Sequence, residues 1–201
     1  MKKIIILITT VSLIALFIAC SGQVIGTNQD IPKGSSANSQ QSQELDKFDY
    51  KFFKDVANSG ITSQTWDSAS QISPESLVCF FGNTTGLSQL STDVESVVIS
   101  GDIVESYIQL YFAVDNKYIR QAMFYDSNNN TYDIPIPYDG AASAKVVAVS
   151  EKDDIISLSY EYYSPSDDIT VIREGTLDIQ ILEPYFKYNY ISCSTTDKSQ
   201  M

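Results

Sequence analysis

The chain has 201 residues, of which 43% are hydrophobic, and its 13 Lys and Arg against 25 Asp and Glu give a formal net charge of −12. A chain of this length holds one ordinary domain with appendages. It contains no histidine, which excludes a Ser-His-Asp or Cys-His nucleophile and a histidine-ligated metal. The excess of acids argues against nucleic acid as a partner, because binding to phosphates requires Lys and Arg.

Residues 1–19 have the pattern of an export signal. Lys2 and Lys3 form a short positive region, and residues 4–19 are apolar except for two threonines and one serine. A helix of residues 4–19 would be about 24 Å long, which is short for a bilayer core of about 30 Å. We therefore expect a cleaved signal peptide rather than a permanent membrane span.

The end of this segment, Phe17-Ile18-Ala19-Cys20, resembles the lipobox of bacterial lipoprotein precursors. The usual lipobox is Leu, a small or aliphatic residue, Gly or Ala, and then Cys, so Phe17 departs from the preferred residue. The resemblance implies cleavage before Cys20 and a diacylglyceryl group on its thiol, which would hold the protein on the outer face of the cytoplasmic membrane. A plain secretory signal and an uncleaved anchor are the alternatives.

The segment after the signal, residues 20–44, is predicted to be a flexible tether. It has no aromatic residue and is rich in Ser, Gln, Asn and Gly, so it cannot bury enough apolar surface to offset its ordering entropy. Beyond it we expect one globular domain over residues 45–191 and a polar tail over residues 192–201.

Two helices are predicted in the first part of the domain. The first ends at Gly60, and the second begins with Ser73 as N-cap and Pro74 in its first turn and ends at Gly82. The apolar face of the first helix consists of Leu45, Phe48, Phe52 and Val56.

Residues 102–114 fit two patterns. A strand would place Val104, Ile108, Leu110, Phe112 and Val114 on one face, interrupted by Ser106, whereas a helix would form a stripe of Val104, Ile108, Tyr111 and Phe112. We favour the helix because Asp102 and Glu105 have the spacing of a capping box.

The rest of the domain has the alternation of β-strands. Predicted strands cover 123–126, 131–135, 145–150 and 155–163, followed by alternating residues 176–181 and a final run with Phe186, Tyr188 and Tyr190. Their short polar turns favour antiparallel pairing. The expected fold is α+β, with N-terminal helices packed on a C-terminal antiparallel meander, in which Leu158 and Ile179 are buried while Ser159 and Asp178 face water.

The stretches IVESYIQLYFAVDNKYIR and FYDSNNNTYDIP, a Gly-Ala loop and the final strands resemble a group of uncharacterised lipoproteins of anaerobic Gram-positive bacteria. The resemblance spans residues 95–191. It implies a fold and a cellular location, and no chemistry.

The cysteines and the Asp-Asn turn are the first candidate sites. Cys79 and Cys193 could form a disulfide in an exported domain, or Cys79 could be a buried apolar residue and Cys193 a tail thiol. Residues 126–130 begin like a calcium loop, but Thr131 replaces its glycine and Pro137 its final glutamate. We therefore interpret them as a turn and expect no metal or cofactor.

Acidic residues in two predicted turns are the candidates for catalysis. Glu151, Asp153 and Asp154 lie in one turn and Asp167 and Asp168 in another. A carboxylate pair can hydrolyse a glycosidic bond when its spacing suits and one pKa is raised. These turns are expected to be solvated, so a catalytic role is the less favoured interpretation.

Aromatic residues are the candidates for binding. The chain has 13 tyrosines and one tryptophan, and such side chains are enriched at recognition surfaces, although tyrosine also favours sheets. Trp66, Tyr160 and Tyr162 are the candidate binding residues. We expect a non-enzymatic module that binds an envelope protein, peptide or glycan, with a carboxylate-dependent glycan hydrolase or an assembly factor of an envelope complex as alternatives.

Overall fold

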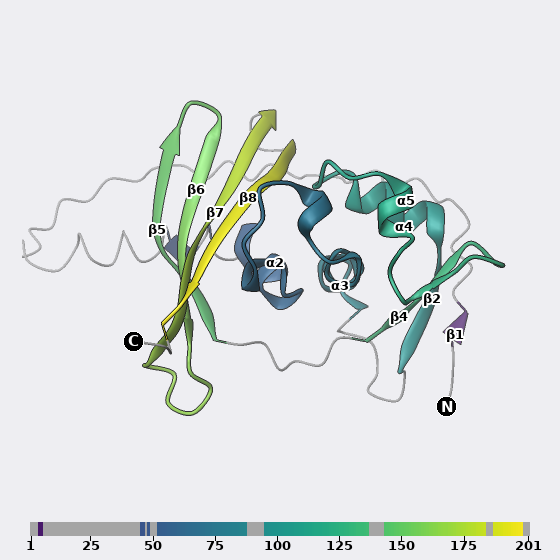
Figure 1. The fold of residues 1–201 in the computed structure, drawn as a ribbon, viewed down its shortest axis with the longest axis horizontal. Helices are drawn as coiled ribbons and strands as arrows, with labels where there is room; N and C mark the ends of the chain where they lie inside the picture. The colour runs from purple at the N-terminus through teal and green to yellow at the C-terminus, as the bar shows by residue number, and fades with distance from the viewer. Residues whose placement is uncertain are drawn as a thin grey trace, which may run out of the picture.

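The structure is a computed structural model that describes residues 4–5, 45–46, 48, 52–87, 95–136, 143–183 and 187–198. Cys20 and nearly all of the predicted signal and tether lie outside these residues. Three layers make up the fold: α2 (Lys54–Asn58) and α3 (Pro74–Thr84) lie between two β-sheets (Figure 1). The expected α+β class is confirmed, with helices mostly N-terminal to the strands.

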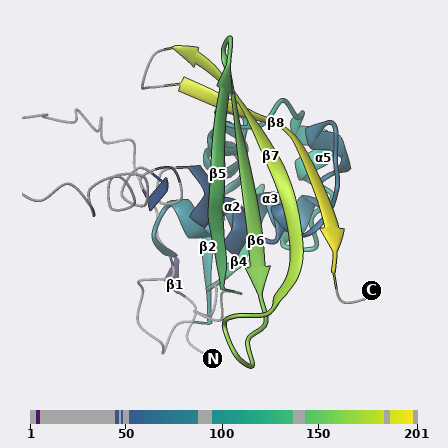
Figure 2. The same cartoon turned by 90° about the vertical axis from the view of Figure 1, so that its left-hand side faces the viewer.

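The C-terminal sheet is an antiparallel meander in the order β5-β6-β7-β8. Its strands are β5 (Ala144–Lys152), β6 (Ile155–Tyr163), β7 (Val171–Glu183) and β8 (Lys187–Asp197). One face packs on the helices, and no described element covers the other face, which points toward the viewer in Figure 2.

The predicted alternation along this sheet is confirmed. Leu158 and Ile179 are fully buried, whereas Ser159 and Asp178 lie on the opposite, partly exposed face. Asp178 is less solvated than expected, because it accepts hydrogen bonds from the Ser157 hydroxyl at 2.6 Å and the Ser192 hydroxyl at 2.8 Å.

The second sheet has the order β1-β2-β4-β3. Its strands are β1 (Ile4–Ile5), β2 (Ser96–Ser100), β3 (Tyr125–Asp126) and β4 (Thr131–Pro135). The β3–β4 hairpin was predicted, and β2 pairs antiparallel with β4. Sequence patterns did not identify β2, whose partner β4 is distant along the chain. The meander expected from the sequence therefore accounts for one of two sheets.

The start of α3 confirms the predicted cap, since the Ser73 hydroxyl accepts a hydrogen bond from the Ser76 N–H at 3.1 Å. The helix continues to Thr84 rather than ending at Gly82. Gly82 lies inside the helix, where a Cβ would make an ordinary van der Waals contact of 3.5 Å with Cγ2 of Ile134. Gly60, with φ of +79°, follows the first helical segment as expected.

The helix favoured for residues 102–114 exists as α4 (Gly101–Ile108), followed by the short α5 (Asn116–Ile119). The capping box is wrong. Ser100 is the N-cap residue and makes no side-chain cap, while Asp102 accepts a hydrogen bond from the Asn130 amide at 3.2 Å. Glu105 is fully buried and has other partners.

The domain was predicted to end at residue 191, with a polar tail over residues 192–201. In the structure β8 continues to Asp197, so this prediction is wrong for residues 192–197. Cys193 points into the core with 1% of its surface exposed. Its backbone pairs with Trp66 through two hydrogen bonds of 2.8 Å. In the sequence, serines on the outer face of a strand resemble a polar tail. Only the buried residue between them, here Cys193, distinguishes a strand from a tail.

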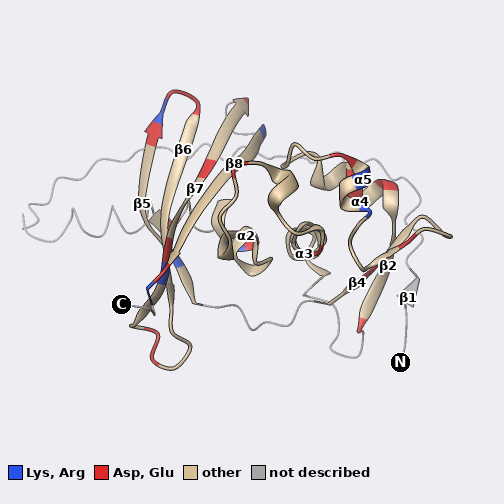
Figure 3. Ribbon diagram, viewed as in Figure 1, with Lys and Arg blue, Asp and Glu red and all other residues tan. Residues whose placement is uncertain are grey.

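Charged residues lie mainly at the strand ends and around α4 and α5, whereas α3 is largely uncharged (Figure 3). Within the described part of the chain, no helix has both the length and the apolar character needed to cross a membrane.

Candidate functional site

The three aromatic residues predicted to bind a ligand are core residues, so that prediction is wrong. Trp66 is 1%, Tyr160 0% and Tyr162 5% exposed. Their polar atoms bond the irregular segment around the 3₁₀ turn η2 (Ile61–Ser63). Tyr160 Oη donates to the Thr62 carbonyl at 2.8 Å, Tyr162 Oη lies 2.6 Å from Thr62 Oγ1, and Trp66 Nε1 donates to the Ile61 carbonyl at 3.1 Å. Buried backbone groups outside regular structure need such partners.

The candidate disulfide is not formed, since Cys79 and Cys193 are both free thiols. Cys79 is partly exposed on α3, whereas Cys193 Sγ lies 3.2 Å from Tyr160 Oη on the buried face of the C-terminal sheet. Burial raises the pKa of Cys193 to about 11. A thiol with a raised pKa is a poor nucleophile, because the thiolate is the reactive form.

The Asp-Asn segment before β4 is a turn, as interpreted. Asp126 accepts hydrogen bonds from the Asn128 N–H at 2.9 Å and the Asn129 amide at 2.7 Å, which lowers the pKa of Asp126. Asn130 has a φ of +51°. Within the described ranges, no group of three or more Cys, Asp or Glu side chains is placed to hold a metal ion.

The candidate acids lie at opposite ends of the C-terminal sheet. Glu151 lies in β5 rather than in the predicted turn, because the strand continues to Lys152, whereas Asp153 and Asp154 lie in the turn after it. One turn joins β5 to β6 and the other joins β6 to β7 (Figure 1), and β6 has nine residues, which span roughly 30 Å. Asp167 accepts three hydrogen bonds from Ile169 and Thr170, which lower its pKa. A catalytic pair cannot combine acids from both turns, and Asp167 serves to shape its loop.

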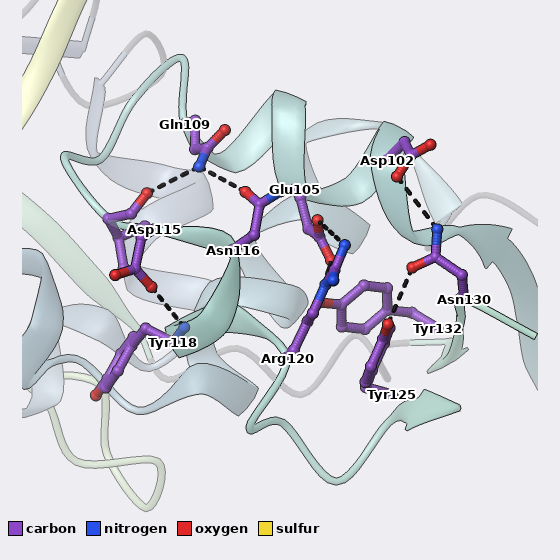
Figure 4. A network of polar contacts seen from close by, with 11 residues as sticks. Asp102, Glu105, Gln109, Asp115, Asn116, Tyr118, Arg120, Tyr125, Asn130 and Tyr132 are labelled. Atoms are coloured by element: carbon purple, nitrogen blue, oxygen red, sulfur yellow. Dashed lines mark hydrogen bonds and ion pairs between the residues drawn. The ribbon is translucent and has the colours of Figure 1, made fainter. Parts of the chain in front are cut away.

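An ion pair with a buried carboxylate connects α4 to the residue after α5 (Figure 4). Nε and Nη2 of Arg120 donate to the two carboxylate oxygens of Glu105 at 2.7 and 3.0 Å, and Tyr132 Oη donates to Glu105 Oε1 at 3.2 Å. The Glu105 side chain is 1% exposed and that of Arg120 is 39% exposed. Both carboxylate oxygens are already bonded, so this network stabilises the fold rather than offering a free group to a ligand.

A second group of side chains, apart from this ion pair, contains partly exposed aromatic rings and a carboxyl group whose pKa is raised. We call Asp55, Tyr107, Tyr111 and Tyr188 the tyrosine–aspartate cluster. Asp55 lies on α2, Tyr107 on α4, Tyr111 in the turn after α4, and Tyr188 on β8. All four are partly exposed. The ring centroids of Tyr107 and Tyr111 are 5.4 Å apart, and those of Tyr111 and Tyr188 are 5.3 Å apart.

Phenylalanine rings hold the three tyrosines in place. Phe81 packs edge-on against Tyr107 at 5.3 Å, Phe80 against Tyr111 at 5.4 Å, and Phe52 against Tyr188 at 4.9 Å. The backbone of β8 is fixed to the turn after α4, because the Tyr190 N–H donates to the Tyr111 carbonyl at 3.0 Å. The partly exposed rings are therefore preorganised.

Asp55 adds a negative charge to the cluster. Burial raises its pKa, and the positive charge of Lys54 opposes this change. The pKa values of Tyr111 and Tyr188 are raised chiefly by burial and also by the negative charge of Asp55. Among the described residues, no second carboxylate contributes to the pKa of Asp55. The arrangement offers one anionic group beside aromatic faces and phenolic hydroxyls, which suits recognition more than paired acid–base chemistry.

Sequence reasoning missed this cluster. Tyr107 and Tyr111 are four residues apart, and that spacing places them side by side on a helix, so one half was visible in the segment interpreted as a helix. Tyr188 and Asp55 join them only through tertiary packing. Comparison with protein-family models, with curated proteins and with solved structures found no match for the chain.

Proposed function

We propose that the protein is an extracytoplasmic lipoprotein, anchored through Cys20, whose domain binds an envelope protein, peptide or glycan without catalysis. The observation that carries the binding role is the tyrosine–aspartate cluster. Tyrosine supplies a large, rigid, amphipathic contact area at low entropic cost, and the phenylalanines behind these rings reduce that cost further.

The anchor is supported by the positive residues Lys2 and Lys3, the apolar segment after them and the sequence Ile18-Ala19-Cys20. Acylation should be measured by labelled palmitate in the full chain, with Cys20→Ala as the variant and Cys79→Ala as the matched control. We expect Cys20→Ala to lose the label and Cys79→Ala to keep it. Equal labelling of both variants would show that Cys20 is not the lipidated residue.

The binding role is tested by placing a photo-crosslinking phenylalanine analogue at Tyr107 and, as a control, at Tyr163. Tyr163 is also partly exposed but lies on the C-terminal sheet, with its hydroxyl donating to Glu161 at 2.6 Å. In the presence of envelope fragments, we expect an adduct at position 107 and none at 163. Adducts of equal yield at both positions, or at neither, would contradict a binding surface at the cluster.

The raised pKa of Asp55 is the one observation that favours the glycan hydrolase as a second candidate, because a general acid needs such a shift. A hydrolase predicts turnover of envelope glycan by the intact chain that Asp55→Asn abolishes. The binding module predicts no turnover by either protein. An adduct at position 107 that contains a subunit of an envelope complex would support the third candidate, an assembly factor.

A further inference from the structure

We infer that the tyrosine–aspartate cluster receives a cationic side chain, the lysine or arginine of a basic peptide segment. This inference rests on the proposed binding function and names the chemistry of its ligand. It combines three observations: the spacing of the rings, the charge of Asp55 acting on Tyr111 and Tyr188, and the charge of the whole chain.

The ring geometry fits a cation. Tyr107 and Tyr111 meet at an interplanar angle of 52°, and Tyr111 and Tyr188 at 56°, so neither pair is stacked face to face. An ammonium or guanidinium group within about 6 Å of a tyrosine centroid is attracted by the ring. Adjacent centroids a little over 5 Å apart allow one cation to contact two rings at once.

The protein uses the same contact for its own basic residues. The Arg120 guanidinium lies 5.5 Å from the centroid of Tyr125, and Lys145 Nζ lies 5.6 Å from that of Tyr163. Arg173 lies 5.9 Å from the centroid of Tyr162 and also forms an ion pair of 2.6 Å with Asp197. In that last case a tyrosine face and a carboxylate share one cation, as we infer for the cluster.

Asp55 makes the cluster selective for positive charge. A partly desolvated carboxylate attracts a cation more strongly than a solvated one does, because the local dielectric is lower. Burial raises the pKa of Asp55 although the charge of Lys54 opposes this change, and a bound cation would further stabilise the ionised carboxylate. An anionic ligand would place like charges together at this point.

The charge of the whole chain favours the same partner. With a formal net charge of −12, the protein attracts basic segments over long range and repels acidic ones. Long-range attraction alone would bind a basic peptide anywhere on the surface, so the test must separate the cluster from this general effect.

The test uses the full chain in detergent, titrated calorimetrically with acetyl-(Gly-Lys)₅-amide and with the neutral acetyl-(Gly-Gln)₅-amide. The variants are Asp55→Asn and Asp153→Asn, which remove the same charge. Asp153 is exposed in the β5–β6 turn and has a φ of +57°, a conformation that Asn tolerates. Thermal melts show whether each variant is folded.

We expect the lysine peptide to bind and the glutamine peptide not to bind. Asp55→Asn should weaken binding at least 10-fold, and Asp153→Asn less than 2-fold. Tyr188→Leu, which keeps an apolar residue but removes the ring, should also weaken binding at least 5-fold. Equal losses for the two Asp variants would show diffuse attraction and overturn the inference. A crosslinked adduct at position 107 without any binding of the lysine peptide would overturn the cationic ligand while leaving the proposed binding function intact.

Discussion

Replacing Glu105 by Gln should destabilise the fold by about 2–3 kcal/mol. The carboxylate is 1% exposed and accepts two hydrogen bonds from Arg120. A hydrogen bond to a charged group contributes about 1.5–3 kcal/mol. One of the two bonds loses its acceptor in the glutamine variant, and the other, from the Arg120 cation to an amide oxygen, is only weakened. The glutamine amide also has only one acceptor oxygen, which leaves one Arg120 N–H facing an NH₂ group.

The matched control is Asp197→Asn, which removes the charge of an exposed ion pair with a similar distance from arginine Nε to the carboxylate oxygen. Arg173 Nε lies 2.6 Å from Asp197 Oδ1, compared with 2.7 Å for Arg120 and Glu105. The Asp197 side chain is 55% exposed, and exposed pairs contribute about 0–1 kcal/mol. Urea unfolding followed by fluorescence of the single tryptophan, Trp66, measures both losses. Equal losses would refute the argument that burial decides the strength of these pairs.

Three further predictions use the same unfolding assay. Leu158→Ala should lower the free energy of unfolding by about 2–5 kcal/mol. Asp178→Ala should lower it by about 1 kcal/mol, because two serine hydroxyls lose their acceptor. Comparable losses for the two variants would mean that the faces of β6 and β7 are misassigned. Gly175→Ala should cost about 1–3 kcal/mol, since a Cβ there collides with the Tyr160 side chain and the Ser194 carbonyl, and a stability equal to wild type would contradict this packing. Asp55→Asn should raise the unfolding midpoint at pH 7, because a raised pKa means that the ionised carboxylate is disfavoured in the folded state. This gain should disappear as pH falls from the folded pKa to below the ordinary value of 3.8, and a gain that persists at pH 3 would contradict its electrostatic origin.

Local signals in the sequence were sufficient for much of the fold. Ser73 and Pro74 mark the start of α3, and the period-two pattern of residues 155–163 matches the bounds of β6. Capping and alternation act over a few residues, so a single segment contains the whole signal. The error at Asp102 shows the limit of this reasoning, since its side chain bonds Asn130 on the neighbouring hairpin instead of the helix that begins there.

Most of the candidate site could not be predicted from local sequence signals. Trp66, Tyr160 and Tyr162 have the aromatic rings and polar atoms that are typical of binding residues. In the structure these polar atoms form hydrogen bonds with buried groups of an irregular segment, and the position of that segment cannot be predicted from the sequence. Asp55 gains its raised pKa from burial, and burial depends on elements that are far apart in the chain. Composition indicates which side chains can recognise a ligand, while packing decides which of them remain accessible.

The last strand has a consequence for the order in which the protein can fold during synthesis. Tyr190 on β8 donates its hydroxyl to the carbonyl of Phe52, 138 positions earlier in the chain, at 2.7 Å, and Cys193 pairs with Trp66. Contacts this distant in sequence form late and slow the folding of a chain. A polypeptide that is synthesised amino end first therefore cannot complete its interior until nearly all of it has been made. The early helical segments stay incompletely packed, and open to proteases and chaperones, until β8 has formed.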